Sequence, residues 1–333
     1  MLVLVVAVFM AACGGEPVEL VKEKTDFSAK IKLEVKNLPK LTDSHYEGWV
    51  LADGRFVSVA KFSVGEDGTI LNLQGQPVNE GIFDFKYLAV DISSRFMVTI
   101  EPNSKTDDSK SPTVVLEGNF SPVKVSDLYF SAYDTESMGG SYQLRSFSDS
   151  NDNMNEYSGL WFMKIVEGKN RPSLDINDLG PGWMYEAWVE KDGRIISLGK
   201  FSGPKTPDMS NIYALNIADL PKYPGEDFLK SATGDSLKMP LSLVVGKNSV
   251  FITLEPYANG LDLSGDSPFS FRLMEAQIPA RARVHFNYDM INVAMNSMPS
   301  GKVLYLPSDQ TSVVEENEVT PLPEVVDGKP VSE

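Results

Sequence analysis

The chain has 333 residues, a length that suits about two domains, and 42% of them are hydrophobic, which is enough for a core in each half. Its formal charge is −16, from 46 acidic and 30 basic residues. Nucleic acids and anionic lipid surfaces are bound through clusters of basic residues, so this balance argues against either as the main partner. The single cysteine excludes an intramolecular disulfide and a metal site built from several thiolates.

Residues 1–13 look like a targeting signal rather than part of the fold. The apolar run at 2–9 is far shorter than the roughly 20 residues of a membrane span. Small residues follow it, directly before Cys13. This arrangement resembles a bacterial lipoprotein signal, which implies cleavage before Cys13 and a lipid on its thiol. An ordinary secretory signal with an incidental cysteine is the alternative, and the lack of a basic residue before the apolar run departs from the usual pattern. We expect a tether over 14–28 and a lipid-anchored protein of the cell envelope, in the outer membrane if the organism has one.

The chain that follows has the pattern of β-strands. Apolar and polar residues alternate over 31–35, as in a half-buried strand. The Asp-Gly pairs at 53–54 and 192–193 lie between apolar arms and predict tight hairpin turns. A strand at 96–100 stops before Pro102, which cannot donate to a sheet ladder. No segment shows the sustained apolar stripe of a helix.

Two blocks of this sequence occur twice. Residues 46–63 return as 185–202, and residues 96–102 return as 250–256. Matched blocks in the same order indicate a duplicated domain. The signature residues of the repeat are Tyr46, Trp49 and Glu101 in the first copy, and Tyr185, Trp188 and Glu255 in the second.

Many short strands with regular turn signals predict an all-β fold of two related antiparallel β-sandwich domains of the immunoglobulin-like kind. We expect the following division of the chain: the first sandwich at 29–125, a connecting β-hairpin and polar loop at 126–158, the second sandwich at 159–306 with a long insertion at 203–240, and a disordered acidic tail at 307–333. The connecting hairpin would turn at Gly139-Gly140, and a second turn is expected at 299–301.

The repeated blocks resemble the extracytoplasmic C-terminal domain of anti-sigma-K factors. The resemblance rests on Tyr-x-x-Trp followed by a turn glycine and a strand ending in Phe, on a strand ending in Thr-apolar-Glu-Pro, and on a later Ser-Pro. The chain shows neither the cytoplasmic helical region nor the membrane helix of that family. The resemblance therefore implies the outer module alone, doubled, with a binding or sensing role and no catalytic residues.

Several side chains are candidates for chemistry or binding. Trp49 and Trp188 are either buried core residues, which we favour because both copies hold them, or platforms for sugar rings. Glu101 and Glu255 either close strands by binding nearby backbone amides, which we favour, or act as the acids of a glycoside hydrolase. The aromatic residues that are not duplicated are better candidates for a ligand surface: Trp183, Tyr213 and Tyr223.

The polar loop near residue 150 places oxygen ligands at Asp149, Asn151 and Asn153, a spacing that suits Ca²⁺. Met154 stands where an EF-hand loop needs glycine, so we favour a solvated turn and expect no metal and no cofactor. The sequence thus predicts a non-catalytic envelope lipoprotein that binds or senses an envelope protein or a glycan. The alternatives are a carbohydrate-binding or glycan-acting protein and a purely structural surface protein.

Overall fold

The computed structural model describes residues 27–52, 54–87, 95–149, 154–233 and 237–307. Almost all regular structure in these ranges is β, and every strand pairing is antiparallel, which confirms the predicted class. The helices are single turns of three residues, and none of the described helices has the length and apolarity to cross a membrane. Cys13 and the predicted signal, most of the predicted tether, and the predicted tail beyond Pro307 lie outside the described residues.

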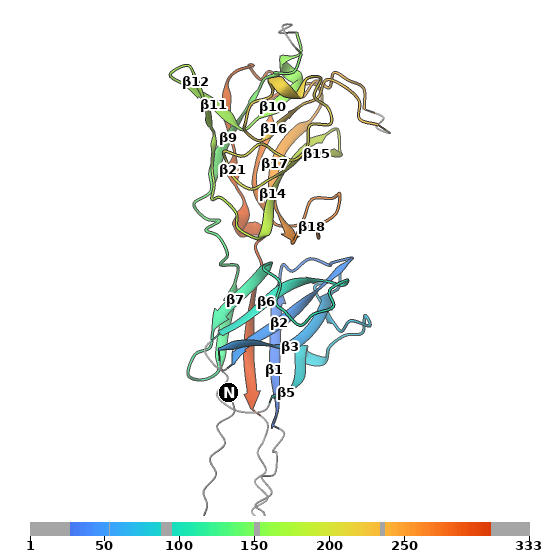
Figure 1. Cartoon of the computed structure of the whole chain (residues 1–333), viewed down its shortest axis with the longest axis vertical. Coiled ribbons are helices and arrows are strands. Elements are labelled where there is room, and N and C mark those ends of the chain that lie inside the picture. The colour runs from blue at the N-terminus through green and yellow to red at the C-terminus, as the bar shows by residue number, and fades with distance from the viewer. Residues whose placement is uncertain (1–26, 53, 88–94, 150–153, 234–236, 308–333) are drawn as a thin grey trace, which may run out of the picture.

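The strands form two groups along the long axis of the molecule (Figure 1). The first group is one sheet of nine strands in the order β4-β3-β2-β6-β7-β8-β22-β1-β5. The bounds are β1 (Phe27–Lys36), β2 (Ser44–Ala52), β3 (Arg55–Val64), β4 (Ile70–Leu71), β5 (Ile82–Tyr87), β6 (Arg95–Pro102), β7 (Val114–Asn119), β8 (Val125–Tyr129) and β22 (Ser300–Pro307).

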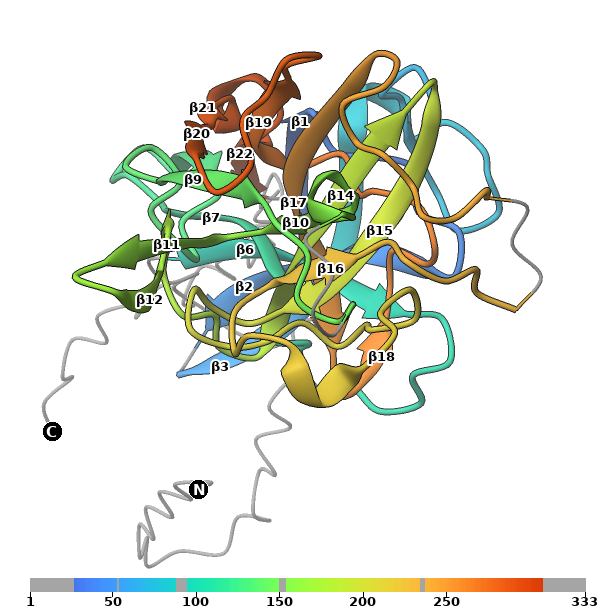
Figure 2. The same cartoon turned by 90° about the horizontal axis from the view of Figure 1, so that it is seen from above.

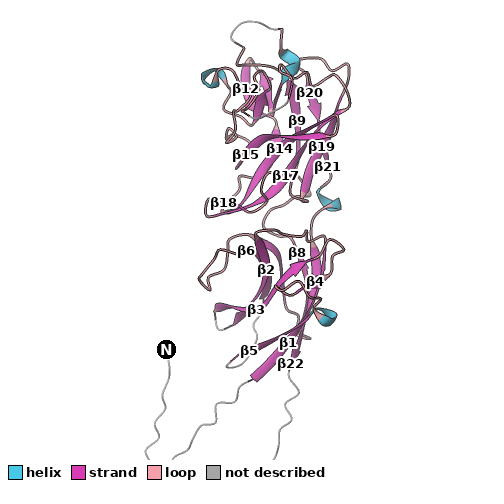
Figure 3. Ribbon diagram, turned by 90° about the vertical axis from the view of Figure 1, so that its right-hand side faces the viewer, coloured by secondary structure: helices cyan, strands magenta, loops and turns pink. Residues whose placement is uncertain are grey.

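The second group holds three sheets: β15-β14-β17-β19-β21 with β18 beside β17, β13-β9-β10-β16 with β20 beside β9, and the hairpin β11-β12. The bounds are β9 (Gly139–Leu144), β10 (Gly159–Trp161), β11 (Met163–Val166), β12 (Lys169–Pro172), β13 (Leu174–Asp175), β14 (Gly182–Lys191), β15 (Arg194–Phe201), β16 (Gly225–Asp227), β17 (Asn248–Ala258), β18 (Leu261–Asp262), β19 (Arg272–Ile278), β20 (Asn287–Asp289) and β21 (Ile291–Asn292). The short 3₁₀ turns, drawn in cyan in Figure 3, are η1 (Asn79–Gly81), η2 (Glu156–Ser158), η3 (Ile217–Asp219) and η4 (Ala294–Asn296).

The core follows from the alternation of side chains along the strands. In β1, Ile31 and Leu33 are buried while Glu34 is exposed. The nine-stranded sheet curls so that β3 faces β5, and the rings of Phe62 and Phe83 lie 5.9 Å apart. In the second group, the rings of Phe162 and Phe201 lie 6.5 Å apart between two sheets. Most buried apolar side chains of both groups form one continuous cluster.

The sequence repeat corresponds to a repeat of four strands. The order β3-β2-β6-β7 returns as β15-β14-β17-β19. The register is also the same, since Tyr46 pairs with Phe62 as Tyr185 pairs with Phe201, and a β-bulge follows two residues later in both hairpins. Below, the first copy means β2, β3, β6 and β7 with their loops, and the second copy means β14, β15, β17 and β19 with theirs.

The last strand corrects one predicted boundary. Residues 300–307 form β22, which lies between β8 and β1 in the first sheet and not in the second unit, where 159–306 placed it. The turn predicted at 299–301 is therefore wrong, because Gly301 lies within the strand. A Cβ on Gly301 would come within 2.5 Å of the Glu34 carbonyl oxygen, so the glycine permits close packing there. Val303 is fully buried in the first group.

The segment 126–158 is not a connecting hairpin. β8 pairs with β7 and β22 in the first sheet, whereas β9 pairs with β10, β13 and β20 in the second group. Gly139-Gly140 begins β9 and makes no turn; a Cβ on Gly140 would lie 2.6 Å from the Leu174 side chain. The insertion at 203–240 is likewise more than a loop, since it contributes β16, whose three residues are all buried.

Candidate functional site

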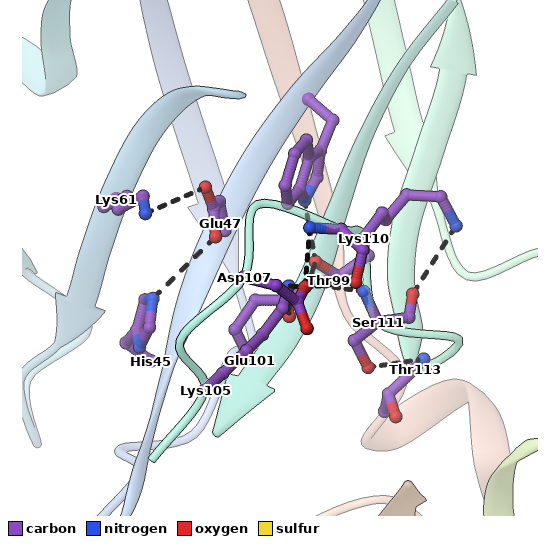
Figure 4. Close-up of polar contacts among 12 residues, drawn as sticks. His45, Glu47, Lys61, Thr99, Glu101, Lys105, Asp107, Lys110, Ser111 and Thr113 are labelled. Atoms are coloured by element: carbon purple, nitrogen blue, oxygen red, sulfur yellow. Dashed lines mark hydrogen bonds and ion pairs between the residues drawn. The ribbon is translucent and has the colours of Figure 1, made fainter. Parts of the chain in front are cut away.

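The repeated residues form a hydrogen-bonded chain on the sheet face opposite Tyr46. In the first copy, Trp49 Nε1 donates to Thr99 Oγ1 at 2.9 Å, and this hydroxyl donates to Glu101 Oε1 at 2.5 Å. The backbone N–H of Ser111 donates to the same carboxylate oxygen at 2.8 Å. Figure 4 shows this network around Glu101.

The second copy repeats the chain. Trp188 Nε1 donates to Thr253 Oγ1 at 2.8 Å, Thr253 donates to Glu255 Oε1, and the Phe269 N–H donates to that oxygen at 3.0 Å. Glu101 and Glu255 are fully buried. The interpretation that these carboxylates bind nearby backbone amides is thus confirmed, and their burial argues against an acid poised in an open cleft.

Both repeated indoles are 2% exposed, which agrees with buried residues and not with open platforms. Neither belongs to the main apolar cluster, although Tyr46 and Tyr185 do. In the first copy, the loop after β6 covers the indole, and Lys105 Nζ lies 5.6 Å from the centre of the Trp49 ring. The expectation of buried core residues is therefore confirmed for burial and wrong for location, because each indole lies on the sheet face opposite the main apolar cluster.

A second carboxylate lies beside each chain and is paired with a lysine of the neighbouring strand. Glu47 is 3.4 Å from Lys61 Nζ, and in the second copy Glu186 binds Lys200. Lys200 also lies 3.1 Å from Asp262. Burial raises the pKa of the Glu186 carboxyl, and the hydrogen bond from Lys200 opposes this effect.

The two copies differ in what lies over the repeated chain. In the first copy, Lys105 Nζ donates to Glu101 Oε2 at 2.7 Å (Figure 4). In the second copy, Glu255 Oε2 is buried and no donor among the described residues reaches it in hydrogen-bond geometry. Burial raises the pKa of Glu255. A cavity of about 300 Å³ lies in this region, lined by Glu186, Trp188, Ser197, Gly199, Lys200, Met209, Ser210, Tyr257, Asp262, Gly265 and Asp266.

A smaller cavity of about 170 Å³ lies between the two strand groups. The loop after β6 forms one wall, and residues 258, 259 and 261 form the other. Nearby, Thr113 Oγ1 donates to the Gly182 carbonyl at 3.1 Å. This cavity is lined by side chains that already pair with each other, such as Lys105 with Glu101.

Two of the three aromatic residues predicted to contact a ligand are buried. Trp183 is 2% exposed and packs against Phe130, with the ring centres 5.5 Å apart. Tyr213 is 7% exposed and packs against Phe228 at 5.4 Å. The prediction is wrong for both, because a buried ring cannot contact a surface ligand.

Tyr223 is the exception, since its ring is half-buried. Its hydroxyl donates to the Asn170 carbonyl at 3.0 Å and so joins the insertion to the β11-β12 hairpin.

The predicted insertion exposes aliphatic side chains that sequence reasoning missed. Met209, Ile212, Leu215 and Ile217 are 66%, 52%, 55% and 60% exposed. The hairpin joined to it exposes Ile165 and Val166. Among the described residues of both segments, the exposed ionic ones are mostly basic: Lys164, Lys169, Arg171, Lys205, Lys222, Lys230 and Lys238, against Glu167 and Asp219. We call these exposed aliphatic and basic residues the distal surface. Its sequence signal was a run of aliphatic residues inside a segment without strand alternation.

Buried carboxylates anchor this insertion. Asp227 accepts the N–H groups of Phe147 and Ser148 at 2.8 and 2.6 Å and the Trp161 indole N–H at 2.8 Å. Burial raises the pKa of Asp208 to about 7 and that of Glu226 to about 8.

The calcium candidate gains no support from the described part of the loop. Asp149 is half-buried, and burial raises the pKa of its carboxyl, whereas Asn151 and Asn153 lie outside the described residues. The described ranges contain no group of three or more His, Cys, Asp or Glu side chains that could hold a metal ion.

No family model, no curated protein and no solved structure matches this chain.

Proposed function

We propose that the chain is a non-catalytic binding protein of the cell envelope, held there by a lipid on Cys13. It consists of two related immunoglobulin-like sandwich domains, each resembling the outer domain of anti-sigma-K factors. The common strand order, register and bulges of the two copies support a duplication. The carboxylates that could act in catalysis have structural partners, as Glu101 has in Thr99, Lys105 and Ser111.

The contact surface of this binding protein is the distal surface. In Figure 1, β1 begins at one end of the elongated molecule and the β11-β12 hairpin lies at the other. Seen along the long axis, β11 and β12 project beyond the neighbouring strands (Figure 2). A protein anchored through its N-terminal segment would thus present this hairpin away from the anchor.

The chemistry of this surface favours a protein partner over a glycan. Sugar rings are recognised by exposed aromatic faces, whereas the side chains exposed at 209–217 are aliphatic. The surrounding lysines stand out on a chain of charge −16. We therefore propose that the partner is an envelope protein whose contact surface is apolar and acidic.

The observation that carries this proposal is the exposure of four aliphatic side chains within nine residues of the insertion. Deleting the insertion would not test it cleanly, because Glu226, Asp227 and Phe228 are fully buried in the core. Substituting Ile212 and Leu215 by aspartate changes the surface alone.

The experiment is cross-linking of the lipidated protein in the envelope of its own organism, followed by mass spectrometry. We expect a specific partner that is lost in the Ile212→Asp/Leu215→Asp variant. It should be retained in Val123→Asp, which alters a 77% exposed side chain of the first strand group. Equal recovery from both variants would show that the distal surface is not the contact site. Absence of any specific partner would favour the structural alternative.

A further inference from the structure

The duplication allows the two copies to be compared at one chemically distinct position. In the first copy, the ammonium group of Lys105 lies between the Trp49 ring and the Glu101 carboxylate, at 5.6 Å and 2.7 Å. The Lys105 side chain is only 16% exposed. The first copy thus carries its own cation over the Trp-Thr-Glu chain.

The second copy has the same chain without that cation. Trp188, Thr253 and Glu255 are bonded as their counterparts are, but the segment from Pro256 to Ser267 contains no lysine or arginine. Instead, the cavity of about 300 Å³ lies against Trp188. Glu255 Oε2, the counterpart of the oxygen that Lys105 binds, is buried and accepts no hydrogen bond of good geometry among the described residues, although the nearby Ser264 hydroxyl group lowers the pKa of this carboxyl.

The charges around the cavity leave a negative excess. Glu186, Asp262 and Asp266 line it against a single lysine, Lys200, whose charge also acts on the buried Glu255. In the first copy the corresponding region balances three carboxylates with three lysines: Glu47, Glu101 and Asp107 against Lys61, Lys105 and Lys110.

One further cation lies on this face of the second copy, but a neighbouring carboxylate neutralises its charge. Arg272 lies 3.8 Å from the Phe251 ring and is bound to Glu275 at 2.9 Å.

We propose that the cavity of the second copy binds the primary ammonium group of an external alkylamine, in the place that Lys105 occupies in the first copy. The ammonium group would lie against Trp188 and the carboxylate of Asp266, which line the cavity together with Ser197, Ser210 and Tyr257, and its charge would act on the buried carboxylate of Glu255. A free diamine and a lysine side chain of a peptide share this chemistry. The site shares Met209 with the distal surface but contains neither Ile212 nor Leu215, so the Ile212→Asp/Leu215→Asp variant tests the distal surface without altering the cavity lining.

Isothermal titration calorimetry of the full chain tests the proposal. The ligands are cadaverine and a blocked lysine, Nα-acetyl-lysine-amide, whose side-chain ammonium group is free. We expect saturable binding at one site per chain, and no binding of pentanediol, which has the same length without charge. Tighter binding of cadaverine would identify a free diamine as the ligand, and tighter binding of the blocked lysine would identify a peptide. Absence of saturable binding for both amines, or equal binding of the diol, would overturn the proposal.

Variants locate the site. Asp266→Asn should weaken amine binding by about threefold, and Glu255→Gln by about tenfold. Asp175→Asn, which removes an exposed carboxylate in β13, should leave affinity unchanged. Equal affinities in all three variants would place the amine elsewhere and refute the assignment.

The first copy supplies an independent test. Lys105→Ala removes the ammonium group that binds Glu101. It leaves a space between the Trp49 ring and the Glu101 carboxylate that an external ammonium group could fill. We expect cadaverine to bind this variant at two sites per chain and to raise its unfolding temperature more than that of the unsubstituted protein. One site per chain and no additional thermal stabilisation would show that Lys105 does not mark an amine position.

Discussion

Glu226→Gln should make the protein more stable at pH 8 and flatten its loss of stability with rising pH. Glu226 and Asp208 lie on either side of the Gly225 backbone: Asp208 accepts the Gly225 N–H at 2.9 Å, and Glu226 Oε1 accepts the Asp227 N–H at 3.0 Å. Glu226 Oε2 is buried, with no hydrogen-bond partner among the described residues. Burial raises the pKa of Glu226 most, and the neighbouring Asp208 raises it further.

The sign follows from proton linkage. The pKa of Glu226 is about 8 in the folded protein against 4.5 for an unperturbed glutamate, so between these values the folded state holds a proton that the unfolded state has lost. Stability therefore falls as the pH rises from about 4.5 to about 8 and then levels off. The difference corresponds to roughly 5 kcal/mol at pH 8 as an upper bound. After subtracting about 2 kcal/mol for a glutamine amide without a partner, we expect a gain of about 3 kcal/mol.

Urea unfolding at pH 5 and pH 8 measures this effect. Glu226→Gln should gain stability at pH 8 and lose about 1 kcal/mol at pH 5, where the cost of the unpartnered amide exceeds the small linkage gain. Some slope should remain in the variant, because burial also raises the pKa of Asp208 and of Glu186. Glu167→Gln, at an exposed position of the β11-β12 hairpin, is the control and should match the unsubstituted protein at both pH values. A variant that is no more stable at pH 8, with an unchanged slope, would refute the linkage reasoning.

Three further sets of substitutions test the packing. Lys105→Met leaves a buried carboxylate without its cation and should cost about 3 kcal/mol in urea unfolding, whereas Lys30→Met, in an exposed ion pair, should cost less than about 1 kcal/mol; equal costs would contradict this. Trp49→Phe and Trp188→Phe each remove an indole donor to a buried hydroxyl and should each cost about 1–2 kcal/mol by the same assay; a loss in only one copy would argue against a shared structural role. Val303→Asp places a charge in the first group's core and should cost about 3 kcal/mol or more, with loss of amide-exchange protection in β1 and β8; a loss confined to β14 and β17 would contradict the strand order.

Local sequence signals predicted the local structure well. The turns at Gly54 and Gly193 adopt φ values of +73° and +82°, which glycine tolerates, and they join the hairpins that the repeat indicated. The expectation that Glu101 and Glu255 bind backbone amides rested on a strand ending at Glu-Pro, and the N–H groups of Ser111 and Phe269 fulfil it.

Pairing between distant parts of the chain could not be predicted in the same way. β22 completes the first sheet by pairing with β1, about 270 residues earlier, and no local pattern states which sheet a strand joins. The prediction for the insertion is wrong for a related reason. Tyr213 is predicted at the surface because it is not duplicated and lies in the long insertion. It packs instead against Phe228 of the same insertion, so the insertion adds apolar core of its own.

The repeat itself indicates where function lies. Side chains that recur in both copies with the same partners, such as Trp49 with Thr99 and Trp188 with Thr253, are explained by folding alone, since each sheet face needs hydrogen-bond partners for its buried indole and carboxylate.

The proposed binding sites must therefore be sought where the copies differ. One difference is the insertion, which gives only the second copy an exposed aliphatic and basic surface. The other is Lys105, which donates to Glu101, whereas one buried oxygen of Glu255 accepts no hydrogen bond among the described residues, and Trp188 of the same hydrogen-bonded chain lines a cavity. Because a buried unpaired oxygen costs free energy in the folded protein, a ligand that supplies the missing cation recovers that cost on binding.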